Sequence, residues 1–343
     1  MPWYTARVTD FRSDNTHGAS PEILDALARA ASGNVTSYGS DPITERLRER
    51  CRDLFECDLE IFPVVTGTAA NALAIASMTP PWGAVFCHED AHIQRDELGA
   101  PEFFTNGAKL IPLAGHLGKL TASDVASAVD ALAREGRAGV PSCLSLTQAT
   151  EAGTLYSLDE LRALGEVARS RKLGVHMDGA RFANAVASLG CAPADLTWRA
   201  GVDVLSFGAT KNGALAAELL VIFRRDLAAQ IAPRWHRGGH RLSKMRFLSA
   251  QLEAYLTDDL WLRNARQANA RAQEIARIEG LELLRPVEAN VVFVRLTAAQ
   301  IEALGGAGIE LYDWPIFGEG AYRIVAGFGT GEDDVKALAR AIA

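Results

Sequence analysis

Strands and helices alternate along the first two thirds of this sequence, and this alternation limits the possible folds more than any other feature. An apolar entry at Pro63–Val65 leads through a Gly-Thr turn into an Ala-rich helical run. A capping box formed by Ser157 and Glu160 opens a helix over 158–171. Further strands are predicted at residues 84–87, 141–147, 173–178 and 202–207. Short connections between such elements predict an α/β fold with a mostly parallel sheet sandwiched by helices.

The pattern changes after Arg225. A loop rich in Pro, Gly and Arg is predicted over 233–239, before a long helix over about 243–278 whose apolar residues recur at helical spacing. Strands at 290–294 and 322–326 and a closing helix from Asp333 predict a compact α+β unit. A different kind of domain therefore follows the sheet.

The chain length agrees with two domains, because 343 residues exceed what a single core usually holds. We place a large domain at residues 1–235. A smaller α+β C-terminal domain, which starts with the long linking helix, is placed at residues 236–343.

Composition excludes several classes of function. The chain has 35 Lys and Arg against 42 Asp and Glu, with the signs interleaved and no basic block, so a nucleic acid partner is not expected. No run of about 18 uncharged apolar residues is present, so no membrane partner is expected either. The five cysteines are scattered without a Cys-x-x-Cys pair, and Met1–Arg7 contains no secretory pattern, which together predict a cytoplasmic protein.

Lys211 and Asp178 are the two strongest candidates for chemistry. Lys211 follows a predicted strand in a loop of small residues, where burial would favour a neutral amine that attacks carbonyls such as the aldehyde of pyridoxal phosphate. Asp178 ends another strand, at the sheet edge where ligands bind in such folds, and its carboxylate could hold the ring nitrogen of that cofactor. An ion pair with Arg181 or a helix cap is the structural alternative for Asp178.

Gly67 and Thr68 begin the Ala-rich helix and could bind a phosphate through exposed amides and a hydroxyl, although a plain helix cap explains them as well. The glycine-rich fingerprints of dinucleotide and P-loop sites are absent from the sequence. A different phosphate-bearing cofactor is therefore favoured.

His92 and Arg323 are further candidates. His92 lies among acidic residues after a strand, and packing against a cofactor ring or acid/base work is favoured over a metal site, so no metal is expected. Arg323 lies in an apolar strand, where its fork suits either a substrate carboxylate or a structural pair with Asp313 or Glu319.

Six segments, in chain order, together resemble the low-specificity L-threonine aldolases, which are fold type I pyridoxal phosphate enzymes. The most specific is the Asp-Gly-Ala-Arg element at Asp178, which Lys211 follows by 33 residues. The segments are residues 13–15, 38–42, 66–71, 91–92, 176–181 and 206–211. The resemblance runs from about Arg12 to the last helix.

This resemblance implies a role for each matching residue. Lys211 would bind the cofactor aldehyde covalently, Asp178 would contact the pyridine nitrogen, and His92 would stack on the ring. Phosphate would be held by Gly67 and Thr68, and the substrate carboxylate by Ser13, Arg181 and Arg323.

The resemblance also implies a homo-oligomer, a dimer or a tetramer, with shared active sites. Tyr38 and Arg241 would then reach the cofactor of a neighbouring subunit. Arg241 is one of four basic residues in its loop, with Arg234, Arg237 and Lys244, and any of them could be the phosphate contact.

One departure concerns the substrate. Many members of the family have Thr-His-Asn where this chain has Thr150-Glu151-Ala152, so Glu151 could replace a histidine near the substrate hydroxyl. This resembles the branch that includes phenylserine aldolases.

The sequence thus predicts a lyase that cleaves L-β-hydroxy-α-amino acids such as threonine, allo-threonine and phenylserine to glycine and an aldehyde. His92 or Glu151 would remove the β-hydroxyl proton. The alternatives are β-elimination or aminotransfer on the same fold, and a non-enzymatic binding protein.

Overall fold

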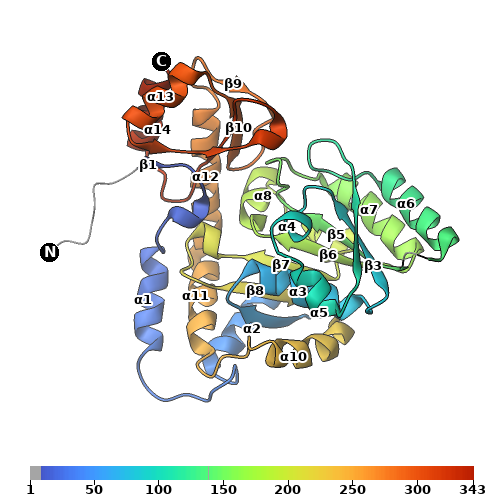
Figure 1. Ribbon diagram of the computed structural model, residues 1–343. Coiled ribbons are helices and arrows are strands. Elements are labelled where there is room, and N and C mark those ends of the chain that lie inside the picture. The colour runs from blue at the N-terminus through green and yellow to red at the C-terminus, as the bar shows by residue number, and fades with distance from the viewer. Residues whose placement is uncertain (1–8, 138) are drawn as a thin grey trace.

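The computed structural model describes residues 9–137 and 139–343 (Figure 1). The segment Met1–Arg7, on which part of the cytoplasmic prediction depends, lies outside the described residues. Among the described residues, the helices are all too short or too polar to span a lipid bilayer.

A seven-stranded sheet forms the centre of the molecule, in the order β2-β8-β7-β6-β5-β3-β4. Strands β4, β3, β5, β6 and β7 are mutually parallel, whereas β8 runs antiparallel to β7 and β2. Their bounds are β2 Glu60–Val64, β3 Gly83–His88, β4 Lys109–Leu113, β5 Val140–Thr147, β6 Gly174–Gly179, β7 Val204–Gly208 and β8 Glu218–Ile222. The predicted mostly parallel sheet is confirmed, and β4 and β8 are strands that the sequence analysis missed.

Helices flank this sheet (Figure 1). All residues of β3 and β6 are buried, which requires cover on both faces. Helix α3 (Gly67–Met78) packs on the middle strands, and its small side chains are buried from Ala69 to Ala76, so the helix approaches the sheet closely. The predicted capping box at Ser157 and Glu160 is present and starts α7. The other helices of this region are α1 Pro21–Ala30, α2 Pro42–Phe55, α4 His92–Arg95, α5 Ala100–Thr105, α6 Ala122–Glu135, α7 Leu158–Ser170, α8 Phe182–Leu189 and α9 Pro193–Leu196.

The predicted loop over 233–239 is wrong for most of its length, because helix α10 (Ala228–Arg237) includes Pro233. Ile231 and Trp235 bury one face of this helix, and the Trp235 indole donates a hydrogen bond of 2.9 Å to the Pro63 carbonyl. This packing outweighs the backbone hydrogen bond that proline removes. The boundary between the two domains stays a prediction.

The predicted helix over 243–278 is two helices, α11 (Arg246–Leu256) and α12 (Leu260–Ile275). The chain turns between them at Asp258 and Asp259, whose φ angles are 50° and 54°. Aspartate adopts this left-handed conformation more readily than most residues. The apolar spacing continues across the turn, so the pattern gave no sign of the break.

The C-terminal part contains a small antiparallel sheet in the order β12-β13-β10-β9, covered by helices that share a second apolar core. Near the other end of the chain, β1 (Thr9–Asp10) pairs with β11 (Ile309–Glu310), which brings residues 13–15 beside this part of the molecule. The bounds are β9 Glu282–Leu283, β10 Val291–Arg295, α13 Ala298–Gly306, β12 Tyr312–Asp313, β13 Ala321–Val325 and α14 Glu332–Ile342.

Candidate active site

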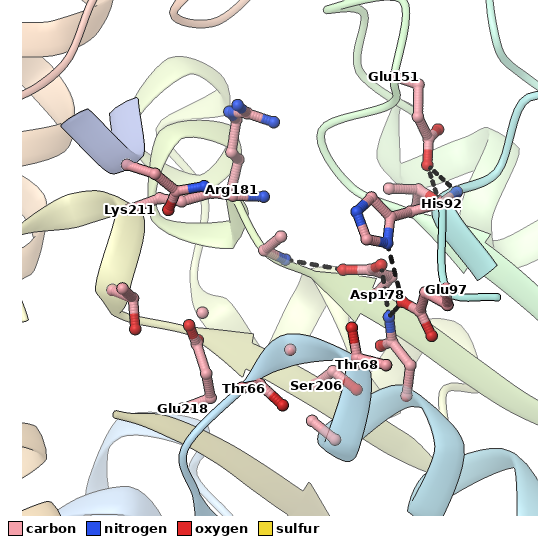
Figure 2. A pocket seen from close by; sticks show the side chains of 18 of the residues that line it. Thr66, Thr68, His92, Glu97, Glu151, Asp178, Arg181, Ser206, Lys211 and Glu218 are labelled. Atoms are coloured by element: carbon pink, nitrogen blue, oxygen red, sulfur yellow. Dashed lines mark hydrogen bonds and ion pairs between the residues drawn. The ribbon is translucent and has the colours of Figure 1, made fainter. Parts of the chain in front are cut away.

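A cavity of about 310 Å³ lies at the carboxyl ends of the central strands (Figure 2). Asp178 reaches it from the end of β6, and Lys211 from the turn after β7. The first turn of α3 closes another side. Parallel strands place their ends at one edge of a sheet, which explains why residues far apart in sequence meet here. We call this the sheet-edge cavity.

Asp178 is 5% exposed and is held by two donors. Its Oδ1 accepts a hydrogen bond of 3.0 Å from the Ala180 amide, and its Oδ2 accepts one of 2.9 Å from Asn71 Nδ2. Arg181 pairs with Asp14 instead, and helix α8 begins only at Phe182. Both structural alternatives for Asp178, an ion pair with Arg181 and a helix cap, are therefore wrong.

The amine of Lys211 lies in the same cavity. Burial is the main cause that lowers the pKa of Lys211, and the charge of Arg181 lowers it further, against the opposing effect of nearby carboxylates. A lowered pKa increases the fraction of neutral amine, which is the nucleophilic form.

His92, at the start of α4, is oriented by a buried carboxylate. Its Nδ1 lies 2.8 Å from Oε1 of Glu97, whose side chain is 0% exposed. The same Glu97 oxygen accepts a hydrogen bond of 2.8 Å from Asn71, which also binds Asp178. The hydrogen bond to Glu97 raises the pKa of His92, although burial opposes it.

The sequence analysis missed both Glu97 and Asn71. Asn71 ends one of the segments that carry the resemblance, and Glu97 follows His92 by five residues. The available signal was that both residues lie close in sequence to predicted site residues. No pattern of residue types indicated that their side chains face the cavity.

Glu151 lies beside His92. It accepts hydrogen bonds from the His92 amide at 2.8 Å and from the Thr147 hydroxyl at 3.0 Å. Burial, and then the charge of Asp178, raises the pKa of Glu151 to about 7. Its Oε2 is buried without a hydrogen-bond partner among the described residues.

The first turn of α3 is open to the cavity. Thr66 caps the helix, because its hydroxyl accepts a hydrogen bond of 3.1 Å from the Ala69 amide, so Gly67 and Thr68 are not needed as the cap. A Cβ built on Gly67 would meet nothing within 4 Å. Free amides and empty space at a helix N-terminus suit an anion.

A second cavity of about 380 Å³ adjoins the first, and the two share the lining residues Asn15, His92, Glu151, Arg181 and Lys211. We call it the aromatic cavity. Its other lining residues include Ser13, Tyr312, Trp314, Ile316, Phe317 and Arg323.

Arg323 lies in the aromatic cavity with its guanidinium carbon 4.3 Å from the centre of the Trp314 ring. Its Nη2 donates a hydrogen bond of 3.1 Å to the Arg12 carbonyl. Burial, and then the charge of Arg181, lowers the pKa of Arg323 to about 10. Within the described chain neither Asp313 nor Glu319 forms an ion pair with it, so the predicted structural pair is wrong.

Arg181 is largely committed to Asp14, a buried residue that the sequence analysis missed. Two hydrogen bonds join them, from Nε to Oδ2 at 2.7 Å and from Nη2 to Oδ1 at 2.9 Å. Ser13 precedes Asp14, and its hydroxyl accepts a hydrogen bond from the Asn15 amide. The two predicted carboxylate ligands Ser13 and Arg181 thus lie near Arg323, at the same cavity.

Tyr38 and Arg241 do not join this group. They line a separate cavity of about 790 Å³, where the guanidinium carbon of Arg241 lies 5.4 Å from the centre of the Tyr38 ring. A role at the cofactor of a neighbouring subunit stays a prediction.

Residues 10–299 match the model of a family described as beta-eliminating lyase. The chain belongs to this family. It is 45% identical to the low specificity L-threonine aldolase of Pseudomonas aeruginosa and 43% identical to that of a Pseudomonas species, covering 98% of this chain and at least 97% of each relative. The predicted resemblance is confirmed.

Solved structures agree with the family. A threonine aldolase from Leishmania major superposes with a TM-score of 0.90 at 27% identity, covering 97% of this chain and 99% of that one. A putative L-allo-threonine aldolase from Listeria monocytogenes, at 16% identity and a TM-score of 0.72, shows the same fold. The predicted fold type I class is confirmed.

Enzymes of this family use pyridoxal phosphate, and the sheet-edge cavity fits that cofactor. It contains an amine with a lowered pKa for the aldehyde and a buried carboxylate for the ring nitrogen. It also contains a helix N-terminus with empty space at Gly67 for the phosphate.

Proposed function

We propose that this enzyme cleaves L-β-hydroxy-α-amino acids of the threonine, allo-threonine and phenylserine type to glycine and an aldehyde by retro-aldol chemistry. The observation that carries the proposal is the connection of the two cavities. Lys211, Asp178, His92 and Glu151 line the first cavity, and Arg323 lines the second, which Lys211 also lines.

The cofactor would be held by the residues of the sheet-edge cavity. Lys211 would bond to its aldehyde, Asp178 would keep the ring nitrogen protonated, and His92 would pack on the ring. Gly67 and Thr68 would hold the phosphate. When bound, pyridoxal phosphate supplies the electron sink that allows a bond to the amino acid Cα to break.

The substrate carboxylate would be oriented by Arg323, with Ser13 and the free side of Arg181. A guanidinium fork fixes the direction of a carboxylate, and this direction selects which bond of Cα is aligned for cleavage. The guanidinium carbon of Arg323 lies 4.3 Å from the centre of the Trp314 ring and 5.7 Å from that of Tyr312.

Glu151 would take the proton of the β-hydroxyl group. Its Oε2 is a buried acceptor without a partner in the described chain, and its pKa of about 7 lies near a neutral working pH. His92 is the other candidate base, but its Nδ1 already bonds to Oε1 of Glu97 at 2.8 Å. We therefore assign the proton transfer to Glu151.

We further propose a cytoplasmic homo-oligomer, a dimer or a tetramer, in which Tyr38 and Arg241 reach a neighbouring active site. Support for the location comes from the cysteines, which are all unpaired: Cys51, Cys57, Cys87, Cys143 and Cys191. Support for the assembly is the position of Tyr38 and Arg241 in a cavity of their own.

The family description favours β-elimination as the second candidate. The two reactions differ in products, because elimination from a β-hydroxy amino acid yields a 2-oxo acid and ammonia, whereas retro-aldol cleavage yields glycine and an aldehyde. The test is a panel of threonine, allo-threonine and phenylserine with all four products quantified. Equimolar glycine and aldehyde support the proposal, and 2-oxo acid with ammonia as main products would overturn it.

A further inference from the structure

Glu218 is a buried carboxylate at the phosphate end of the sheet-edge cavity, and the proposed mechanism gives it no task. It lies in β8, paired in register with Val64 of β2 and Gly208 of β7. The residue is 8% exposed and lines the cavity. In Figure 2, Glu218 and Thr66 lie on the side of the cavity away from Glu151 and His92.

Hydrogen bonds from Ala209 and Thr210, which follow β7, lower the pKa of Glu218 against the burial that raises it. Oε2 accepts a hydrogen bond of 2.9 Å from the Ala209 amide. The charge of Lys211, in the turn after β7, lowers the pKa of Glu218. The charge of Glu218 in turn contributes to the raised pKa of the Tyr255 phenol on α11. On the side of β2 and α3, the neighbouring lining residues are uncharged: Val65, Thr66, Gly67 and Thr68.

A carboxylate and a phosphate dianion repel each other strongly in a buried site. Among the described residues that line the cavity, the cationic side chains are Lys211 and Arg181. Arg181 is already paired with Asp14. The amine of Lys211 would bond to the cofactor aldehyde rather than neutralise the phosphate. The Arg241 proposed to come from a neighbouring subunit would offset one of the two phosphate charges, so an ionised Glu218 would still oppose phosphate binding at the helix N-terminus.

We propose that Glu218 binds the cofactor phosphate as a neutral carboxylic acid, donating its O–H to a phosphate oxygen, so that phosphate binding takes up one proton. This inference rests on the proposed function, because it needs the cofactor in this cavity. Burial already raises the pKa of Glu218 to about 7, so the neutral acid is within reach at neutral pH.

The experiment uses the full chain, freed of cofactor, and pyridoxamine 5′-phosphate as the probe, because this compound has no aldehyde to react with Lys211. Calorimetric titration at pH 8 in two buffers of different ionisation enthalpy counts the protons taken up. We expect Glu218→Gln to take up about one proton fewer per site than the wild type. In the wild type, the affinity for the probe should fall about tenfold per pH unit between pH 8 and pH 9. In Glu218→Gln this pH dependence should be absent.

The matched control is Asp203→Asn. Asp203 is another carboxylate whose pKa is raised by burial, but it precedes β7, bonds to the Val175 amide and lies outside the cavity. Proton uptake in this variant should equal that of the wild type. A second measurement needs no variant. It is the difference in proton uptake by the wild type between pyridoxamine 5′-phosphate and pyridoxamine, which isolates the contribution of the phosphate.

Equal proton uptake by the wild type and Glu218→Gln would overturn the inference while leaving the proposed function intact. So would an equal uptake for the probes with and without phosphate. If the wild type binds neither probe at any pH, the cofactor assignment and the proposed function fail together.

Discussion

The sheet-edge cavity and the aromatic cavity are built in different ways although they share five lining residues. The sheet-edge cavity takes its side chains from the ends of adjacent strands and from α3, and hydrogen bonds join Asp178, Asn71, Glu97 and His92 in one network. The aromatic cavity is closed by short segments of the C-terminal part, where Tyr312 is 45% exposed.

This difference separates the chemistry from the choice of substrate. Strand ends and a capped helix fix the positions of the reacting groups, which catalysis requires. Short exposed segments can change their side chains without disturbing the sheet, so we expect substrate preference to reside there.

The sharpest test of this division is Glu151→Gln, which removes the proposed base while keeping the shape of the side chain. We expect kcat to fall by about 10²- to 10⁴-fold. Binding of the cofactor should change little. In the wild type kcat should fall as the pH drops below about 7, because the raised pKa of Glu151 leaves it protonated there. Stopped-flow measurement of aldehyde release checks both; an unchanged kcat would transfer the role to His92.

Arg323→Lys tests the substrate side of the comparison. Lysine keeps the charge but not the two-pronged fork, so we expect the KM for amino acid substrates to rise by roughly 10- to 100-fold. Absorbance of the bound cofactor should stay as in the wild type. A loss of cofactor binding in this variant would contradict the assignment of the cofactor to the sheet-edge cavity and of the substrate carboxylate to the aromatic cavity.

Trp314→Ala opens the aromatic cavity at a residue that contacts Phe293 and Arg323. We expect kcat/KM for phenylserine to fall by about tenfold, relative to that for threonine. Competition between the two substrates, read by the aldehydes released, measures the ratio. An unchanged ratio would place substrate preference in the sheet-edge cavity.

Glu97→Gln perturbs the network of the sheet-edge cavity without removing a residue from it. The hydrogen bond that the His92 imidazole donates to Glu97 raises the pKa of His92, so this variant should lower that pKa. Titration of the His92 ring protons by NMR should show a shift to lower pH. A matched change in Glu160, an exposed carboxylate that pairs with Lys119, should leave the signal in place.

The smallest expected effect concerns stability. The pKa of Glu151 is raised in the folded chain from an ordinary value near 4.5 to about 7, so the folded state loses stability as the pH rises through this window. By linkage, the free energy of unfolding that is lost once the pH has risen above 7 is at most about 3 kcal/mol. Glu151→Gln should therefore raise the Tm of the cofactor-free chain at pH 8 and change it little at pH 4.5, as thermal denaturation would show.

The same contrast explains what the sequence could predict. Asp178, Lys211, Gly67 and Thr68 each follow a predicted strand or begin a predicted helix, and strand ends converge whatever the details of packing. Their meeting in one cavity therefore followed from local patterns and from the resemblance.

Other features depend on tertiary contacts that no local pattern contains. Glu218 lies in β8, a buried strand that the sequence analysis missed. The ion pair between Asp14 and Arg181 joins two distant segments, and the pairing of β1 with β11 positions the first of them. Likewise, the turn at Asp258 and Asp259 interrupts an apolar pattern that continues unbroken on both sides. On the substrate side, Ser13, Arg181 and Arg323 were predicted from the resemblance, but the aromatic residues Tyr312, Trp314 and Phe317 of the same cavity were not.

The central claim is that Lys211 bonds to the aldehyde of pyridoxal phosphate in the sheet-edge cavity. Incubating the protein with the cofactor, reducing with borohydride and mapping peptides by mass spectrometry tests it directly. The account predicts the reduced cofactor on Lys211, with no labelling in Lys211→Ala. Stoichiometric labelling of another lysine, or none at all in the wild type, would contradict it.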